Sequence, residues 1–127
     1  MKKLLLTLSL LLSTTMFSSL SFGEWELRVT SKSGDDFYWD RDQVRVNQGL
    51  VYWYLLVNNL KPTKSGILSA TVYQESDCQR MSITDLSLSF YKRAMAEGQA
   101  ETITKSNPEV SYPSLSSSNG IVLKEVC

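Results

Sequence analysis

Apolar and polar residues alternate along most of the chain after residue 24, and this two-residue period is typical of half-buried β-strands. We expect strands at residues 25–30, 37–39, 44–46, 50–58, 67–76, 81–91 and 100–105. Clusters of Gly, Ser, Asn, Asp and Pro separate these segments, as loops and turns do. Residues 81–91 are ambiguous because the following residues 91–97 allow a helical turn, but Leu86, Leu88 and Phe90 alternate with serines, which favours a strand through Tyr91.

The segment 50–58, LVYWYLLVN, is the strongest strand of the chain. Successive strand residues point to opposite faces of a sheet. One face therefore carries the expected core, made of Val51, Trp53, Leu55 and Val57. The other face carries Tyr52, Tyr54, Leu56 and Asn58, a set suited to a partly covered surface because tyrosine has an apolar ring and a polar tip.

The stretch after Pro113 has a different pattern and predicts a short helix. Either Ser114 or Ser116 could cap its first turn. Leu115, Ile121, Val122 and Val126 form a loose apolar stripe that would lie on the sheet. We expect this helix to end at Cys127.

The first 23 residues have the features of a signal peptide. Lys2 and Lys3 precede a leucine-rich run, and small residues lead to Gly23. A transmembrane anchor is the alternative, but the apolar run is shorter than the roughly 20 residues that a spanning helix needs. No cysteine lies near the cleavage point, so we expect an exported protein that is not a lipoprotein, in the periplasm or outside the cell, with no membrane anchor after cleavage.

The expected mature chain, residues 24–127, has the size of a single domain. Without Lys2 and Lys3 it carries 11 basic and 13 acidic residues, a formal charge of −2. It has no basic tract, and nucleic-acid binding relies on neutralising phosphates with lysine and arginine. We therefore expect no nucleic-acid partner.

Cys78 and Cys127 are the two cysteines of the chain. Oxidising compartments form and keep disulfides, so we expect these two to be bonded. Two free thiols or an intermolecular bond are the alternatives. In the chain-entropy model, a loop of this length contributes about 4 kcal/mol to stability.

The inventory of reactive side chains argues against an enzyme. The chain has no histidine, the commonest general base and a frequent zinc ligand. The acids of DDFYWDRD (Asp35, Asp36, Asp40 and Asp42) could suggest calcium or carboxylate chemistry, but the glycine and closing glutamate of a calcium loop are absent. We expect these aspartates to begin and end structural elements, and we expect no cofactor or metal.

The aromatic run Phe37-Tyr38-Trp39 has two interpretations as well. Stacking against a sugar or a peptide would need the rings on one face, whereas strand alternation places Tyr38 opposite its two neighbours. Packing against the strand 50–58 is therefore the favoured interpretation.

Several segments together resemble the surface-adhesin protein E family of exported bacterial domains. They are FYWD at residues 37–40, VYWYLLV at 51–57, CQRMSITDLSLSFYKRAMAEGQ at 78–99 and YPSLSSSNGIVLKEVC at 112–127. The resemblance covers most of residues 25–127 and depends on the order of the segments and on the two cysteines. It implies an α+β fold, a single antiparallel sheet of about six strands with a C-terminal helix packed on it. It also implies that Cys78 and Cys127 form the bridge and that Asp40 is the acid ending the second strand.

The resemblance further implies a bacterial surface role with binding to host matrix proteins. We therefore expect a small non-enzymatic domain that acts by protein–protein contact, with a periplasmic accessory or structural protein, such as a homodimer, as the alternative. The candidate contact residues are Tyr52, Tyr54, Arg80, Lys92 and Arg93, because tyrosine and arginine are enriched at interface hot spots. In the alternative interpretation, the tyrosines pack under the helix and the cations are solvated.

Overall fold

A computed structural model gives the fold and describes residues 24–127. The predicted signal peptide, residues 1–23, lies outside the described residues. In chain order the described elements are β1 (Glu26–Thr30), β2 (Asp36–Trp39), the 3-10 helix η1 (Arg41–Gln43), β3 (Arg45–Asn47), β4 (Leu50–Asn58), β5 (Ser69–Asp77), β6 (Ser82–Tyr91), the 3-10 helix η2 (Ala94–Ala96), β7 (Ala100–Thr104), β8 (Val110–Ser111) and the helix α2 (Ser118–Val126).

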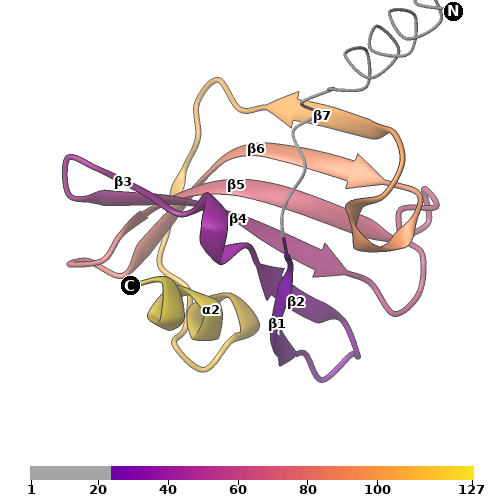
Figure 1. The fold of residues 1–127 in the computed structure, drawn as a ribbon, viewed down its shortest axis with the longest axis horizontal. Helices are drawn as coiled ribbons and strands as arrows, with labels where there is room; N and C mark the ends of the chain where they lie inside the picture. Colours follow the sequence, from indigo (N-terminus) through magenta and orange to yellow (C-terminus); the bar gives the residue numbers. More distant parts are fainter. Residues whose placement is uncertain (1–23) are drawn as a thin grey trace, which may run out of the picture.

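The strands form one antiparallel sheet in the order β1-β2-β4-β5-β6-β7 (Figure 1). The short strand β3 pairs with the start of β4, while β2 pairs with its end, and β8 pairs with the start of β6. The predicted α+β fold, a sheet of about six strands with a C-terminal helix, is confirmed. The sequence pattern does not predict β8, because its two residues are too few to show alternation.

The turn between β3 and β4 follows from its sequence. Gln48 and Gly49 connect the strands, and both have a positive φ, of 52° and 80°. A two-residue hairpin loop with two positive φ angles is the turn that matches the twist of paired strands. The turn lies where the sequence predicts a break, between the expected strands 44–46 and 50–58.

The core lies between the sheet and α2. Val51, Trp53 and Leu55 of β4 pack with Val122 of α2, and Trp53 and Val122 are fully buried. The Trp53 indole donates a hydrogen bond of 2.7 Å to the Ser76 hydroxyl, which satisfies its buried N–H. The alternation of the strand 50–58 therefore identified the core face correctly.

Helix α2 packs against β1 and β2 at one side of the sheet (Figure 1). Its N-cap is Ser117, whose hydroxyl accepts a hydrogen bond from Gly120 N at 3.1 Å. The prediction of Ser114 or Ser116 as the cap was wrong. Residues 114–117 instead form a turn, in which Ser117 N donates to Ser114 O at 3.0 Å, so the helix starts later. Within residues 24–127, no helix is long and apolar enough to cross a membrane.

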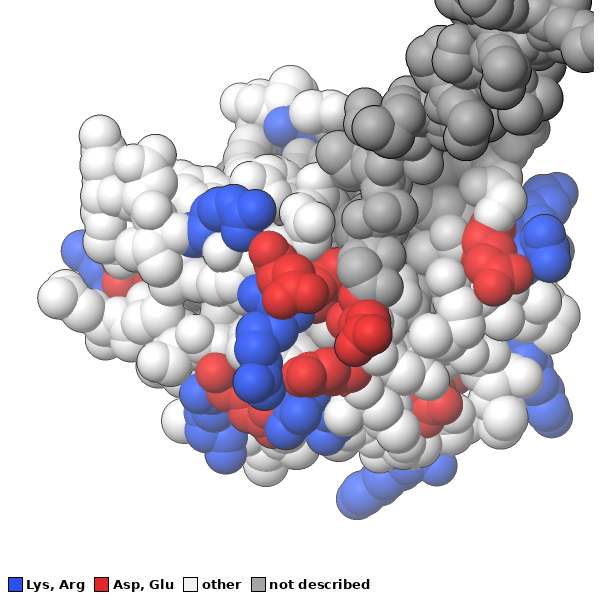
Figure 2. All heavy atoms as spheres, in the orientation of Figure 1, with Lys and Arg blue, Asp and Glu red and all other residues white. Residues whose placement is uncertain are grey.

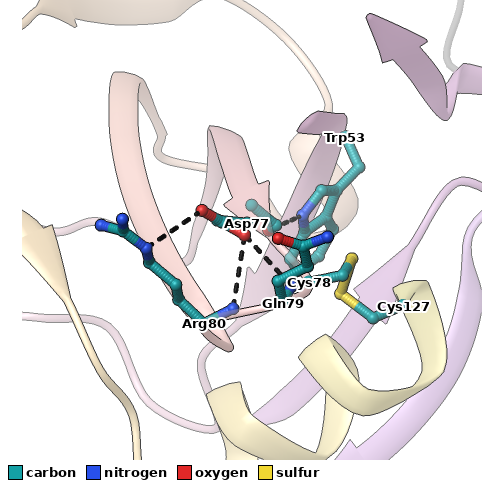
Figure 3. The surroundings of a disulfide bond; sticks show 7 residues. Trp53, Asp77, Cys78, Gln79, Arg80 and Cys127 are labelled. Carbon is teal, nitrogen blue, oxygen red and sulfur yellow. Dashed lines mark hydrogen bonds and ion pairs between the residues drawn. A yellow bond between two sulfur atoms is a disulfide. The ribbon is translucent and has the colours of Figure 1, made fainter. Parts of the chain in front are cut away.

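The disulfide joins the end of α2 to the turn between β5 and β6. The Cα atoms of Cys78 and Cys127 are 5.4 Å apart, a normal spacing for a bridge. Figure 3 shows the bond beside Trp53, at the turn where Asp77 and Arg80 lie. The predicted pairing is confirmed, and it fixes the C-terminal end of the helix next to the core.

Acidic and basic side chains crowd together over α2 and the neighbouring start of β1 (Figure 2). Arg28 forms ion pairs with Glu125 of α2 and with Glu26, and Glu26 also pairs with Arg41 at 3.2 Å. The Trp39 indole donates to the same Glu26 carboxylate at 3.1 Å. These charges satisfy one another and connect the first strand to the helix.

Candidate functional site

Three tyrosines form a row on the sheet face opposite α2. Tyr52 and Tyr54 belong to β4, and Tyr73 lies directly opposite Tyr54 on β5. The Tyr73 ring centroid is 4.7 Å from that of Tyr54 and 6.2 Å from that of Tyr52. All three side chains are partly exposed. We name Tyr52, Tyr54 and Tyr73 the tyrosine row. The alternative that the tyrosines pack under the helix was wrong, because α2 covers the face of Trp53 instead.

The pKa values of two phenols in this row, those of Tyr52 and Tyr54, are raised above their usual range. The hydrogen bond from Tyr52 to the Glu75 carboxylate, 2.9 Å long, is the main cause that raises the pKa of Tyr52. Desolvation is the main cause that raises the pKa of Tyr54. The Tyr52 and Tyr54 phenols are therefore neutral at physiological pH and able to take part in hydrogen bonds without carrying a charge.

The loop around η2 lies over one end of the same face. Met95 N donates to the Asn58 side chain at 2.9 Å, and Ala96 N donates to the Ser69 hydroxyl at 2.9 Å. The Ser69 hydroxyl in turn donates to Arg93 O at 2.6 Å. These contacts hold the loop on the sheet where Asn58 pairs with Ser69. The tyrosine row lies further along the same two strands.

Arg80 lines a small pocket that adjoins the tyrosine row. We name it the Glu75 pocket; its volume is about 240 Å³, and its lining includes Glu75, Asp77, Ser82, Thr84 and Tyr112. Glu75 is also the hydrogen-bond partner of Tyr52. Of the predicted contact residues, Tyr52, Tyr54 and Arg80 therefore fall in one region of the surface.

Lys92 and Arg93 lie elsewhere. They follow the end of β6, whereas Arg80 precedes its start, so about 30 Å of strand separates them. They line a second pocket of about 440 Å³. Arg93 pairs with Glu97 at 3.2 Å, and both side chains are largely exposed. The structure thus separates the five candidate residues into two groups.

The aspartates of DDFYWDRD serve local structure. Asp35 accepts a hydrogen bond from Leu60 N at 2.9 Å, and Asp36 accepts one from the Thr30 hydroxyl at 2.6 Å. Asp40 is fully buried and caps η1, accepting from Asp42 N at 3.1 Å. The interpretation that these acids begin and end elements is confirmed for Asp35, Asp36 and Asp40, whereas Asp42 lies in the middle of η1. Within residues 24–127, no three acidic or cysteine side chains gather in the way that a metal site requires.

Asp40 allows a direct test of this structural role. Replacing Asp40 with alanine should lower the free energy of unfolding by about 1 to 2 kcal/mol, because the cap is lost. Asp40→Asn keeps an acceptor oxygen and should cost less. Urea unfolding followed by tryptophan fluorescence measures both, with the exposed Asp42→Ala as the matched control. Equal stability of Asp40→Ala and Asp42→Ala would contradict this role for Asp40.

Sequence reasoning assigned no contact role to Tyr73, Glu75, Thr84 or Tyr112. Alternation places Tyr73 on a face with Thr71, but only the register shows that it meets Tyr54. The pocket depends on β8, which brings Val110 beside Thr84. The one signal available in the sequence was the cluster of tyrosines within two expected neighbouring strands.

Comparisons with known proteins agree with this fold. The family model described as surface-adhesin protein E matches residues 25–127. Crystal form II of Haemophilus influenzae protein E aligns with a TM-score of 0.64 at 14% identity, covering 89% of this chain and 96% of that chain. The selenomethionine form of the same protein gives 0.63 at 16% identity, covering 90% and 89%. No match was found among curated proteins.

These structural likenesses, at such low identity, concern the fold alone. The family match extends from the residue before β1 to the bridged Cys127. This chain therefore belongs to the surface-adhesin protein E family.

Proposed function

We propose that this chain is a small exported binding domain, not an enzyme, that acts by protein–protein contact through the tyrosine row. The observation that carries the proposal is the position of the row, on the sheet face opposite α2. Host extracellular matrix proteins are the partners that the family's adhesin description suggests. Family membership is a weaker argument than the site itself, because one fold can serve many functions.

The chemistry of the row suits a protein interface. Tyrosine offers a large rigid ring and a polar tip, and it is enriched among the residues that dominate binding energy. Mutual packing of Tyr54 and Tyr73 and the hydrogen bond from Tyr52 to Glu75 limit the motion of these side chains before binding. Pre-ordered side chains lose less entropy when a partner binds.

The proposal includes export. We infer that residues 1–23 direct secretion and that residues 24–127 act in the periplasm or outside the cell. The disulfide supports this inference, since such bonds persist in oxidising compartments. Protease treatment of intact cells, followed by detection of the domain, distinguishes a surface location from a periplasmic one.

A binding experiment tests the role of the tyrosine row. The mature protein is applied to immobilised, purified extracellular matrix proteins, and affinity is measured by surface plasmon resonance. Tyr54→Ala should weaken binding by about 10- to 30-fold, as expected for a hot-spot residue. The control is Ile103→Ala on β7, a 52% exposed side chain at the far side of the sheet, which should leave affinity unchanged.

Two results would overturn the proposal. The folded wild-type protein could bind neither matrix proteins nor any component of the bacterial envelope. Alternatively, Tyr54→Ala could bind as tightly as the wild type while circular dichroism shows that its fold is intact.

The second candidate function is that of a periplasmic accessory protein that forms a homodimer. Strand β7 favours this candidate, because it is the last strand in the order of the described sheet and all five of its residues are exposed. One side of β7 pairs with β6, and the other side is an edge of the sheet. Such an edge can add a strand from another chain. Light scattering on the mature protein distinguishes a dimer from a monomer, and periplasmic retention would favour this candidate over an adhesin.

A further inference from the structure

The Glu75 pocket continues the face that carries the tyrosine row. Across the sheet, Glu75 lies between Tyr52 on β4 and Thr84 on β6, and Asp77 lies opposite Ser82. Because cross-strand partners share a face, these side chains project to the same side as the tyrosine row. A partner lying on the row would therefore reach the pocket.

Asp77 and Arg80 in this pocket form an ion pair with each other. One Asp77 oxygen accepts hydrogen bonds from Gln79 N at 3.1 Å and Arg80 N at 3.3 Å, which shapes the turn before β6. The other oxygen lies 3.8 Å from Arg80 Nε. Figure 3 shows this acid and this cation side by side. Their charges offset one another and leave Glu75 as the remaining charged group of the lining.

Glu75 has a neutral partner only. Its carboxylate accepts a hydrogen bond from the Tyr52 phenol, and within residues 24–127 no lysine or arginine forms an ion pair with it. Its side chain is partly buried. A carboxylate that is partly withdrawn from water gains from an opposite charge, since the surroundings screen the attraction less than bulk water does.

The other groups of the pocket also suit a cation. Tyr112 lines it and is 65% exposed, so its ring is accessible to a charged group. Cations are attracted to the faces of tyrosine rings. Ser82 and Thr84 add hydroxyl oxygens, which can accept hydrogen bonds from an ammonium or guanidinium group.

We propose that the Glu75 pocket binds a lysine or arginine side chain of the protein partner, next to the contact made by the tyrosine row. This inference deepens the proposed function and rests on it for the identity of the ligand as part of a protein. A phosphate or carboxylate group would instead be repelled by Glu75, because the charges of Asp77 and Arg80 offset one another.

The test uses a cationic probe that does not require the partner. The ¹⁵N-labelled mature protein is titrated, at low ionic strength, with an acetylated and amidated tripeptide that has lysine between two glycines. The matched peptide has norleucine in place of lysine, which keeps the aliphatic stem and removes the charge. The lysine peptide should shift the amide signals of Glu75, Thr84 and Tyr112, and added salt should reduce these shifts.

Two variants give the test its specificity. Glu75→Gln keeps an oxygen that can accept from Tyr52, so the fold should persist, but it should weaken lysine-peptide binding about three- to tenfold. Glu101→Gln is the control, an exposed acid on β7, and it should leave binding unchanged.

Equal shifts with the norleucine peptide, no shifts at the pocket, or unchanged affinity in Glu75→Gln would each overturn the inference. Its failure can be told from that of the proposed function. If Tyr54→Ala loses the protein partner while Glu75→Gln affects neither partner nor peptide, only the pocket assignment is wrong. If the lysine peptide binds at Glu75 but no protein binds at the tyrosine row, the pocket assignment stands and the proposed function is wrong.

Discussion

Replacing both Cys78 and Cys127 with serine is expected to lower the free energy of unfolding by about 4 kcal/mol. The bond closes a loop of 49 residues, and without it the unfolded chain gains the entropy that the closed loop had removed. Domains of this size have about 5 to 15 kcal/mol of net stability. The variant would thus lose a large share of its stability, as guanidinium unfolding of the oxidised wild type and the double variant would measure.

The location of the bond defines the controls for this experiment. Cys127 ends α2, and the helix contributes the fully buried Val122 and Leu123 to the core. The wild type unfolded in the presence of a reductant should match the double serine variant, since both lack the same bond. A loss below about 1 kcal/mol in both would mean that packing of α2 alone holds the C-terminus in place.

Local patterns were sufficient to predict strands β1 to β7, because alternation shows which residues form strands. The single antiparallel sheet was implied by the family resemblance. Alternation in residues 50–58 correctly separates the core residues Trp53 and Leu55 from Tyr52 and Tyr54. Alternation does not determine which residues of neighbouring strands lie opposite each other. The pairing of Tyr54 with Tyr73 depends on the register of β4 against β5, which alternation within one strand does not show.

The Glu75 pocket was beyond sequence reasoning for a related reason. The pocket forms because β8 pairs with β6 and the next residue, Tyr112, then lines the pocket. Strand β8 has only two residues and therefore no recognisable pattern in the sequence. The pocket brings together residues that are distant in sequence, whereas the basic residues are near in sequence but lie apart in the fold. Arg80, Lys92 and Arg93 are close in sequence, but a fully extended strand carries Arg80 away from the other two.

The N-cap of α2 shows how tertiary contact selects among equivalent local signals. Ser114, Ser116 and Ser117 are the same residue type in one run, so propensity cannot separate them. Residues 114–117 form a turn whose backbone lies close to Gly120, and the helix begins after this turn. Ser117 then lies at the correct distance to accept from Gly120 N.

Gly120→Ala is expected to destabilise the domain by about 2 to 3 kcal/mol, as overpacking against a fixed neighbour does. A Cβ atom at this position would lie 2.0 Å from Ser114 O and 2.8 Å from Leu115 Cα. These are backbone atoms that cannot move aside by a change of rotamer, so the helix or the preceding turn must shift. Such a shift would disturb Val122 and Leu123, both fully buried. Thermal and urea unfolding would measure the loss.

The direction of this effect separates close packing from helix propensity. In an exposed helix, glycine to alanine normally stabilises by about 1 kcal/mol. The control is Asn119→Ala, because Asn119 precedes Gly120 in α2 and is exposed. Alanine at this position should leave the stability unchanged or raise it slightly. If Gly120→Ala also stabilises the protein, then the turn at residues 114–115 yields to the added methyl group. The close approach of that turn would then be a consequence of glycine at position 120 and not a requirement of the fold.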